Sequence, residues 1–194
     1  MKFRLCLALL SALVLVTLRA EDPKTTNKEP KKMDKVIKTD DDWRKKLTPE
    51  QYAVTRHAAT ESPFGAAYEA FNAQGEGTYY CVCCGAELFT SKEKFHSGCG
   101  WPSFYDASKA KNVAEHVDDS HGMRRVETVC KRCDAHLGHV FEGEGYKTPT
   151  DRRFCINAAA LLFVPKGGAA PKLEPLGSEK VEAAKAAVKK AAGE

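Results

Sequence analysis

The 194-residue sequence carries little net charge. Its formal charge is +4, and this falls to +1 without the first twenty residues, which contain Lys2, Arg4, Arg19 and no acidic residue. Domains that bind nucleic acids usually gather lysine and arginine into a strongly basic surface. The composition therefore gives no reason to expect a nucleic acid as a partner. The sequence also lacks internal repeats, apart from two similar cysteine turns, which excludes an array of repeated units.

The N-terminal apolar run is too short for an ordinary membrane span. It extends from Leu5 to Leu18, whereas a spanning helix needs about 20 residues. Basic residues precede it and the small residue Ala20 follows it, which is the layout of a secretory signal peptide. We therefore expect residues 1–20 to be a signal peptide and the protein to be exported, as a periplasmic or secreted protein. Cleavage would leave no stable membrane insertion, whereas an uncleaved signal would act as a membrane anchor.

Both ends of the remaining chain are poor in the residues that build a core. Residues 21–42 contain no aromatic side chain and are crowded with charge and proline, so we predict a flexible charged linker. Residues 166–194 are rich in alanine and lysine and have few larger apolar side chains. We predict a solvated, partly helical C-terminal tail there, because short isolated helices are only marginally stable in water.

The region 43–165 has the pattern of a single mainly β domain, a small α+β fold. Short apolar and alternating runs lie between glycine- and proline-bearing loops, as expected for a mostly antiparallel sheet. A short helix to about Thr60 is predicted after Thr48, because Thr48 can cap it, Pro49 suits the first helical position and Gln51 completes a capping box. A domain of this length holds only a modest core.

The number of cysteines excludes a pure disulfide framework. Eight occur, and one of them lies within the predicted signal peptide, so seven remain in the mature chain. An exported domain stapled only by disulfides should have an even number. Some of the thiols must therefore have another role. The eight are Cys6, Cys81, Cys83, Cys84, Cys99, Cys130, Cys133 and Cys155.

Four cysteines form two Cys-x-x-Cys turns that predict a metal site. Cys81 and Cys84 make the first turn, Cys130 and Cys133 make the second, and 45 residues separate the two. Four thiolates brought together in this way form a closed structural site for one zinc ion, Zn²⁺, which would staple a small core. Two alternatives are a redox-active dithiol, which normally needs a strand-helix-strand context, and a pair of disulfides. Cys83 is interpreted as a buried spare thiol.

The two remaining thiols lie in unusual surroundings. In an extended segment Arg153 and Asn157 share a face with Cys155, because side chains alternate with period two. A neighbouring guanidinium favours the thiolate, which is the nucleophilic form of cysteine. Cys99 lies between two glycines, which would leave its thiol open to reaction partners. A buried structural cysteine remains the alternative for Cys155.

The surrounding residues can supply a small pocket and a proton donor. Trp101 and Phe104 follow Cys99 closely and could form its apolar wall, although ordinary core packing is the alternative, above all for Phe104. His136 and His139 follow the second cysteine turn. Histidine exchanges protons near neutral pH, and four cysteines already satisfy the predicted metal. We therefore interpret the histidines as acid or base groups.

Five segments together resemble the B-type methionine sulfoxide reductases. In chain order they read LTPEQYAVTRHAATESPF, YYCVCCGAELF, KFHSGCGWPSF, SHGMRRVETVCKRCDAHLGHVF and RRFCINAAALLF, and the resemblance covers about Trp43 to Val164. It implies a fold of two antiparallel β-sheets with a few short N-terminal helices, stapled by the four-cysteine zinc site. It also implies reduction of the R epimer of methionine sulfoxide, chiefly in proteins.

The same resemblance assigns roles to individual residues. Cys155 resembles the catalytic cysteine, which would become a sulfenic acid, and Cys99 resembles the resolving cysteine, which would form a disulfide with it. Trp101 resembles the residue that packs on the methyl group of the substrate. The residues that resemble the polar pocket around the sulfoxide are His121, His136, His139, Arg153 and Asn157.

The resemblance also implies partners and leaves one alternative. The partners would be oxidised proteins and a thioredoxin or thioredoxin-like reductant, and we expect a monomer. The sequence departs from the usual family pattern at three positions near Cys155: Phe154 stands where the family usually has tyrosine, and Ala158 and Ala160 replace two serines. The alternative is a non-catalytic zinc-stapled β module that binds a protein partner, which would leave Cys99 and Cys155 without a role.

Overall fold

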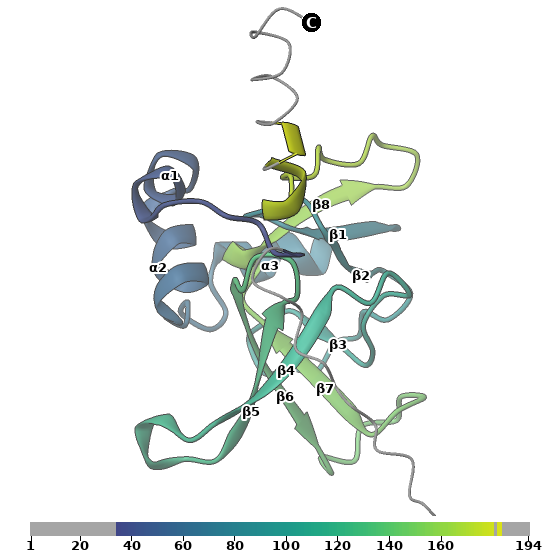
Figure 1. Ribbon diagram of the computed structural model, residues 1–194. Helices are drawn as coiled ribbons and strands as arrows, with labels where there is room; N and C mark the ends of the chain where they lie inside the picture. The colour runs from purple at the N-terminus through teal and green to yellow at the C-terminus, as the bar shows by residue number, and fades with distance from the viewer. Residues whose placement is uncertain (1–33, 181, 184–194) are drawn as a thin grey trace, which may run out of the picture.

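The computed structural model describes residues 34–180, 182 and 183 (Figure 1). The predicted signal peptide lies outside the described residues. Within the described residues, none of the helices combines the length and apolar character that a membrane crossing requires. Three short helices precede the strands: α1 (Asp40–Lys46), α2 (Pro49–His57) and α3 (Ala66–Ala73).

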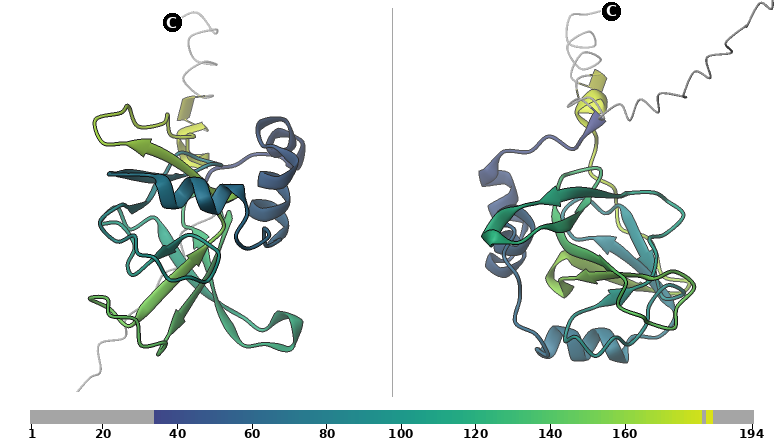
Figure 2. Two further views of the ribbon diagram at one scale, coloured as in Figure 1. Left: turned by 180° about the vertical axis from the view of Figure 1, so that it is seen from behind. Right: turned by 90° about the horizontal axis from the view of Figure 1, so that it is seen from below.

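Eight strands form two antiparallel sheets, which confirms the predicted fold class. The smaller sheet has the order β2-β1-β8, and the larger has the order β3-β7-β6-β5-β4. Figure 1 shows α1 and α2 stacked beside the sheets, and the view from behind in Figure 2 shows α3 crossing in front of the smaller sheet. The strands are β1 (Gly77–Cys81), β2 (Glu87–Thr90), β3 (Ser103–Phe104), β4 (Val113–Asp118), β5 (Arg125–Cys130), β6 (His136–Glu142), β7 (Arg152–Ile156) and β8 (Leu161–Pro165), with single helical turns η2 (Ser120–Gly122) and η3 (Ala158–Ala160).

Helix α2 begins as its sequence predicts. The Thr48 hydroxyl accepts the N–H of Gln51, the Gln51 side chain accepts the N–H of Thr48, and proline occupies the first turn. The helix ends at His57 instead of about Thr60, because Ala58 adopts a left-handed conformation with φ 52°. Residues 58–65 are thereby released as a loop that leads to the functional site.

An aromatic core lies between the sheets and includes Phe104. Phe104 is 0% exposed, and its ring stacks on Phe89 with a centroid distance of 4.3 Å. Phe71 from α3 and Tyr79 from β1 pack against it with their ring edges. Burial of each such ring stabilises the fold by about 1.5–3 kcal/mol. Phe104 is therefore a core residue, and the prediction that it binds substrate is wrong.

The N-terminal boundary of the folded unit differs from the predicted linker 21–42. Helix α1 starts at Asp40, with Thr39 as its cap. Val36 is buried and its N–H donates to the carbonyl of Arg132 over 2.7 Å. Hydrophobicity alone does not reveal this segment, because backbone hydrogen bonds and one apolar side chain attach it to the domain.

The predicted tail, 166–194, also begins on the domain. The N–H of Glu174 donates to the carbonyl of Cys84 over 2.9 Å, and the Glu174 carboxylate pairs with Lys38 and Lys46. Helical conformation follows at 177–180 and at 182–183. The segments on either side of the domain thus meet over the two cysteine turns.

A four-thiol metal site and a paired-thiol pocket

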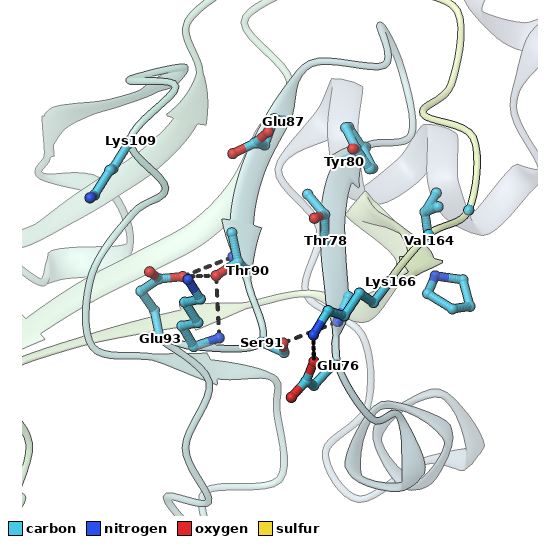
Figure 3. A pocket seen from close by; sticks show the side chains of 15 residues that line it. Glu76, Thr78, Tyr80, Glu87, Thr90, Ser91, Glu93, Lys109, Val164 and Lys166 are labelled. Carbon is cyan, nitrogen blue, oxygen red and sulfur yellow. Dashed lines mark hydrogen bonds and ion pairs between the residues drawn. The ribbon is translucent and has the colours of Figure 1, made fainter.

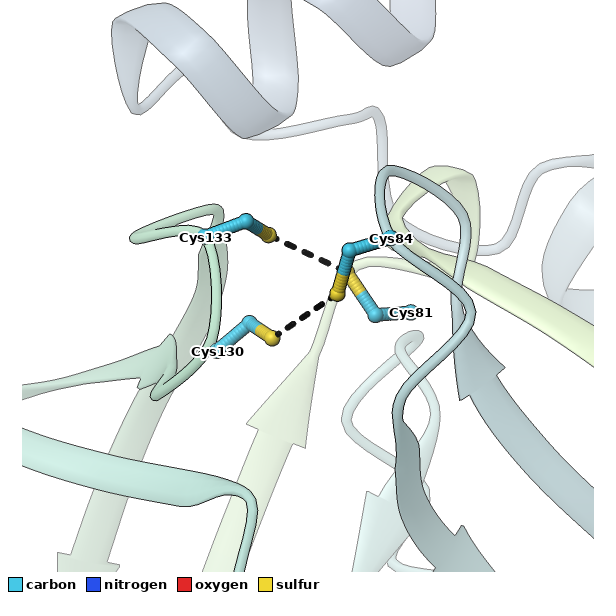
Figure 4. Close-up of side chains that lie close together, drawn as sticks. All are labelled: Cys81, Cys84, Cys130 and Cys133. Atoms are coloured by element: carbon cyan, nitrogen blue, oxygen red, sulfur yellow. Dashed lines mark hydrogen bonds between the residues drawn. The ribbon is translucent and has the colours of Figure 1, made fainter. Parts of the chain in front are cut away.

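The four cysteines of the two turns converge on one point (Figure 4). Their sulfur atoms all lie within 4.8 Å of one another, with 3.7 Å between Cys81 and Cys133 and 3.5 Å between Cys84 and Cys130. A disulfide requires about 2.05 Å, whereas sulfurs bound to zinc at about 2.3 Å in a tetrahedron lie about 3.8 Å apart. The arrangement fits zinc and confirms the predicted structural site.

Two matching turns create this geometry. Gly85 with φ 76° donates its N–H to the carbonyl of Cys81, and Asp134 with φ 55° donates to the carbonyl of Cys130. One turn follows β1 of the smaller sheet and the other follows β5 of the larger sheet. The metal therefore staples the two sheets. Cys83 is fully buried beside this site, as expected for a spare thiol.

The other two thiols also meet. The sulfur of Cys155, on β7, lies 3.9 Å from the sulfur of Cys99, although the two residues are 56 positions apart in the sequence. Ser103 pairs with Cys155 across the β3–β7 ladder, and the Ser97 hydroxyl donates to the Cys99 sulfur over 3.0 Å. Both thiols are partly exposed. The sheet register thus brings a nucleophile candidate and a second thiol within reach of one another.

Hydrogen bonds and one cation set the charge of this pair. The hydrogen bond between the thiols, with help from Ser97, lowers the pKa of Cys99 to about 4. The same bond, together with burial, raises the pKa of Cys155. The pair therefore titrates as a unit that holds one thiolate. Arg153 places Nη1 at 3.4 Å from the Cys99 sulfur, where it stabilises this charge, and Glu144 fixes the guanidinium through two bonds of 2.8 Å.

A small pocket of about 170 Å³ opens onto Cys155. Trp101 and His139 are both part of its lining. A larger hollow of about 710 Å³ lies on the outer face of the smaller sheet, but its lining contains no cysteine or histidine (Figure 3). The chemistry-bearing residues therefore mark the smaller pocket. Its lining is Thr60, Trp101, Arg125, Gly138, His139, Phe141, Cys155, Ile156 and Asn157.

An aspartate holds the histidine that lines the pocket. His139 donates from Nε2 to Asp118 over 2.8 Å, and Arg125 donates to the same carboxylate oxygen over 2.6 Å. Bonds from Ser120, His139 and Arg125 lower the pKa of Asp118, so this carboxylate is ionised. Sequence reasoning missed Asp118 and Arg125, because the β4–β5–β6 pairing alone brings Arg125 to the pocket lining and Asp118 to His139.

The second histidine lies deeper. His136 is 4% exposed and donates from Nδ1 to Glu127 over 2.6 Å. Burial lowers the pKa of His136, although Glu127 opposes the shift. Its ring lies 5.4 Å from that of His139, so His136 is placed behind the pocket rather than on its wall. Glu127 was also missed by sequence reasoning.

Of the remaining predicted polar residues, Asn157 is part of the pocket lining and His121 is not. Asn157 lines the pocket, but its amide donates to the carbonyl of Leu137 over 3.0 Å and its oxygen accepts the N–H of Glu61 over 3.0 Å, so it anchors backbone. His121 is exposed in η2 with φ 54° and is not among the lining residues. The structure does not bring His121 into the polar pocket where it was expected.

Comparison with known proteins agrees with this geometry. The family model of the SelR domain matches residues 47–165. The peptide methionine sulfoxide reductase MsrB of Chromohalobacter salexigens is 51% identical over 132 residues, which cover 68% of this chain and 97% of that protein. The protein of the same name from Herminiimonas arsenicoxydans is 53% identical over 130 residues, which cover 67% and 92%. That from Hahella chejuensis is 51% identical over 131 residues, covering 68% and 91%.

Proposed function

This chain belongs to the SelR domain family, and on that basis we propose that it reduces methionine sulfoxide in peptides and proteins with Cys155 as its nucleophile. The observation that carries the proposal is the contact between the Cys155 and Cys99 sulfurs at the wall of a pocket that also holds Trp101 and His139. A thiol pair beside an aromatic ring and an acid group suits a substrate with one methyl group and one polar oxygen.

The first step consumes the sulfoxide. The proton shared by the two thiols moves from Cys155 to Cys99, and the resulting Cys155 thiolate attacks the electrophilic sulfur while His139, oriented by Asp118, protonates the oxygen. The oxygen then passes from the methionine sulfur to the Cys155 sulfur as the bond between the two sulfurs breaks, so methionine leaves and Cys155 becomes a sulfenic acid. The methionine sulfur is reduced by two electrons and Cys155 is oxidised by two.

The second step resolves the oxidised cysteine. Cys99 attacks the Cys155 sulfur and expels the oxygen as water, which forms a disulfide; the two sulfurs must close from 3.9 Å to about 2.05 Å. An external dithiol then reduces the disulfide by exchange. We propose a thioredoxin or a thioredoxin-like protein as this dithiol.

The zinc site supports this chemistry without taking part in it. When bound, zinc supplies a cross-link between the two sheets through Cys81, Cys84, Cys130 and Cys133. We further propose that the enzyme is exported, on the basis of the signal-like residues 1–20, and that it repairs oxidised proteins outside the cytosol. Its reductant would then be a thioredoxin-like protein of that compartment.

The epimer preference tests the pocket assignment. The indole of Trp101 would hold the methyl group and the imidazole of His139 would donate to the oxygen, so the two substituents of the sulfoxide would occupy chemically different subsites and we expect reduction of the R epimer only. His139→Ala should lower the single-turnover rate by about 10²–10³, because it removes a donor to developing charge. Trp101→Ala should mainly raise KM, because the apolar contact exists in both ground and transition states. Equal rates on separated R and S epimers by the unaltered enzyme would refute this assignment.

A further inference from the structure

Glu61, a residue outside the predicted site, makes two hydrogen bonds to site residues and two to the segment that follows the Cys155 strand. Glu61 lies on the loop 58–65, next to Thr60 of the pocket lining. Its N–H donates to Asn157 Oδ1 over 3.0 Å, and its carbonyl accepts the indole N–H of Trp101 over 3.0 Å. Its carboxylate accepts the N–H groups of residues 158 and 159 over 2.7 and 2.9 Å. Glu61 thus joins three segments that are distant in sequence.

The carboxylate replaces a missing local cap. Asn157 stands at the start of η3 but makes no side-chain cap to that turn, because its amide bonds instead to Leu137 and Glu61. The first N–H groups of a helical turn have no partner within it. Glu61, which is 97 residues before Ala158, supplies both bonds that are needed just after the Cys155 strand.

Keeping the Glu61 carboxylate ionised at this position costs free energy. Glu61 is partly buried, and no cation in the described part of the chain comes within ion-pair distance of it. Burial raises its pKa, and the two N–H groups oppose that shift. A buried ionised group without a counter-ion is destabilising unless its hydrogen bonds offset the loss of hydration. Such a cost suggests a role in the site.

We propose that Glu61 is a positioning residue that locks the indole of Trp101 against the pocket and ties it to the segment following Cys155. This inference rests on the proposed function. The indole would present its face to the substrate methyl group only while the 58–65 loop is anchored through Glu61. Glu61 holds the indole through its backbone carbonyl and the segment after Cys155 through its carboxylate, and this fixes the distance between Trp101 and the nucleophile.

The test uses the full chain with Glu61→Ala and Glu61→Gln, and Glu69→Ala as control. Glu69 is an exposed glutamate on the neighbouring helix α3. The two N–H groups bind different carboxylate oxygens, and glutamine replaces one of these acceptors with an NH2 donor. We expect Glu61→Ala to lower kcat/KM about 10- to 100-fold, since displacement by about 1 Å can cost roughly that much. Most of the loss should appear in KM, as for Trp101→Ala. Glu61→Gln should be intermediate and the control unchanged.

Two readouts separate positioning from general destabilisation. Acrylamide quenching reports on Trp101, because the other tryptophan, Trp43, is 4% exposed, and quenching should increase in Glu61→Ala. The double variant of Glu61→Ala with Trp101→Ala should be no worse than Trp101→Ala alone, because coupled residues are non-additive. Additive losses in kcat/KM, or unchanged quenching in both Glu61 variants, would overturn the proposal. If the unaltered enzyme did not reduce methionine sulfoxide, the proposed function would fail, while the quenching data would still decide the anchoring role.

Discussion

Gly138 offers the sharpest test of how the sheet positions the nucleophile. It lies on β6 opposite Ile156 of β7, with φ 157°. A Cβ at this position would lie 2.0 Å from the carbonyl oxygen of Cys155 and 3.0 Å from its carbonyl carbon. Real contacts of a Cβ are essentially never shorter than 3.0 Å, so the strand must retreat by at least an ångström in Gly138→Ala. That strand carries the proposed nucleophile.

The expected magnitudes follow from this displacement. A shift of about 1 Å in a reacting group can reduce kcat/KM by about 100-fold. Overpacking costs typically 1–3 kcal/mol, so the melting temperature should also fall, by several degrees. The assay is the reduction of a dabsylated R-sulfoxide substrate, beside a melting curve. Gly75→Ala is the matched control, because its Cβ would meet nothing within 4 Å. Wild-type kcat/KM in Gly138→Ala would refute the placement of Cys155 by this ladder.

Three further predictions test the metal, the thiols and the buried histidine. Cys130→Ser should abolish zinc binding and folding. Zinc binding by four thiolates contributes about 10–16 kcal/mol to folding, which is as large as the free energy of unfolding of a whole domain. A stable variant without zinc, as found by metal analysis, would contradict this prediction. Cys155→Ser should release no methionine in a single turnover, whereas Cys99→Ser should complete one and accumulate a dimedone-reactive sulfenic acid. Because burial lowers the pKa of His136, its contribution to stability is full above about pH 6.5 and is lost as pH falls through the folded pKa. In urea unfolding, the free energy of unfolding of His136→Gln should fall less below about pH 6.5 than that of the unaltered protein. The same pH dependence in both proteins would contradict this role of His136.

The local motifs of the sequence predict the zinc site well, because the geometry of each cysteine turn is encoded within six residues. Gly85 and Asp134 close the two turns with the same hydrogen bond. Pairing the turns needs only the strands that precede them. By contrast, Asp118 and Glu127 lack any local signal, since they reach the histidines across strands whose register is set by the whole sheet.

The Phe104 error has a simple physical cause. Proximity in sequence to Trp101 suggested a shared pocket, yet successive side chains of a strand point to opposite faces. Ser103 pairs with Cys155 on the thiol face, and Phe104 pairs with Phe154 on the core face. The strand period, applied to β3, excludes Phe104 from the pocket once the pairing with β7 is known. His121 lies in the left-handed region of η2, is exposed and is not part of the pocket lining.

The arrangement of strands explains why a metal without redox chemistry should still govern the activity. The second cysteine turn joins β5 to β6, and β6 begins at His136, only three residues after Cys133. Strand β5 carries Glu127, the partner of that histidine, and β6 continues to His139 and pairs with the strand of Cys155. Any loosening of the turn therefore shifts both histidines relative to the nucleophile. Zinc removal should consequently impair reduction through geometry, because β5 and β6, which the second cysteine turn joins, also contribute residues to the pocket lining.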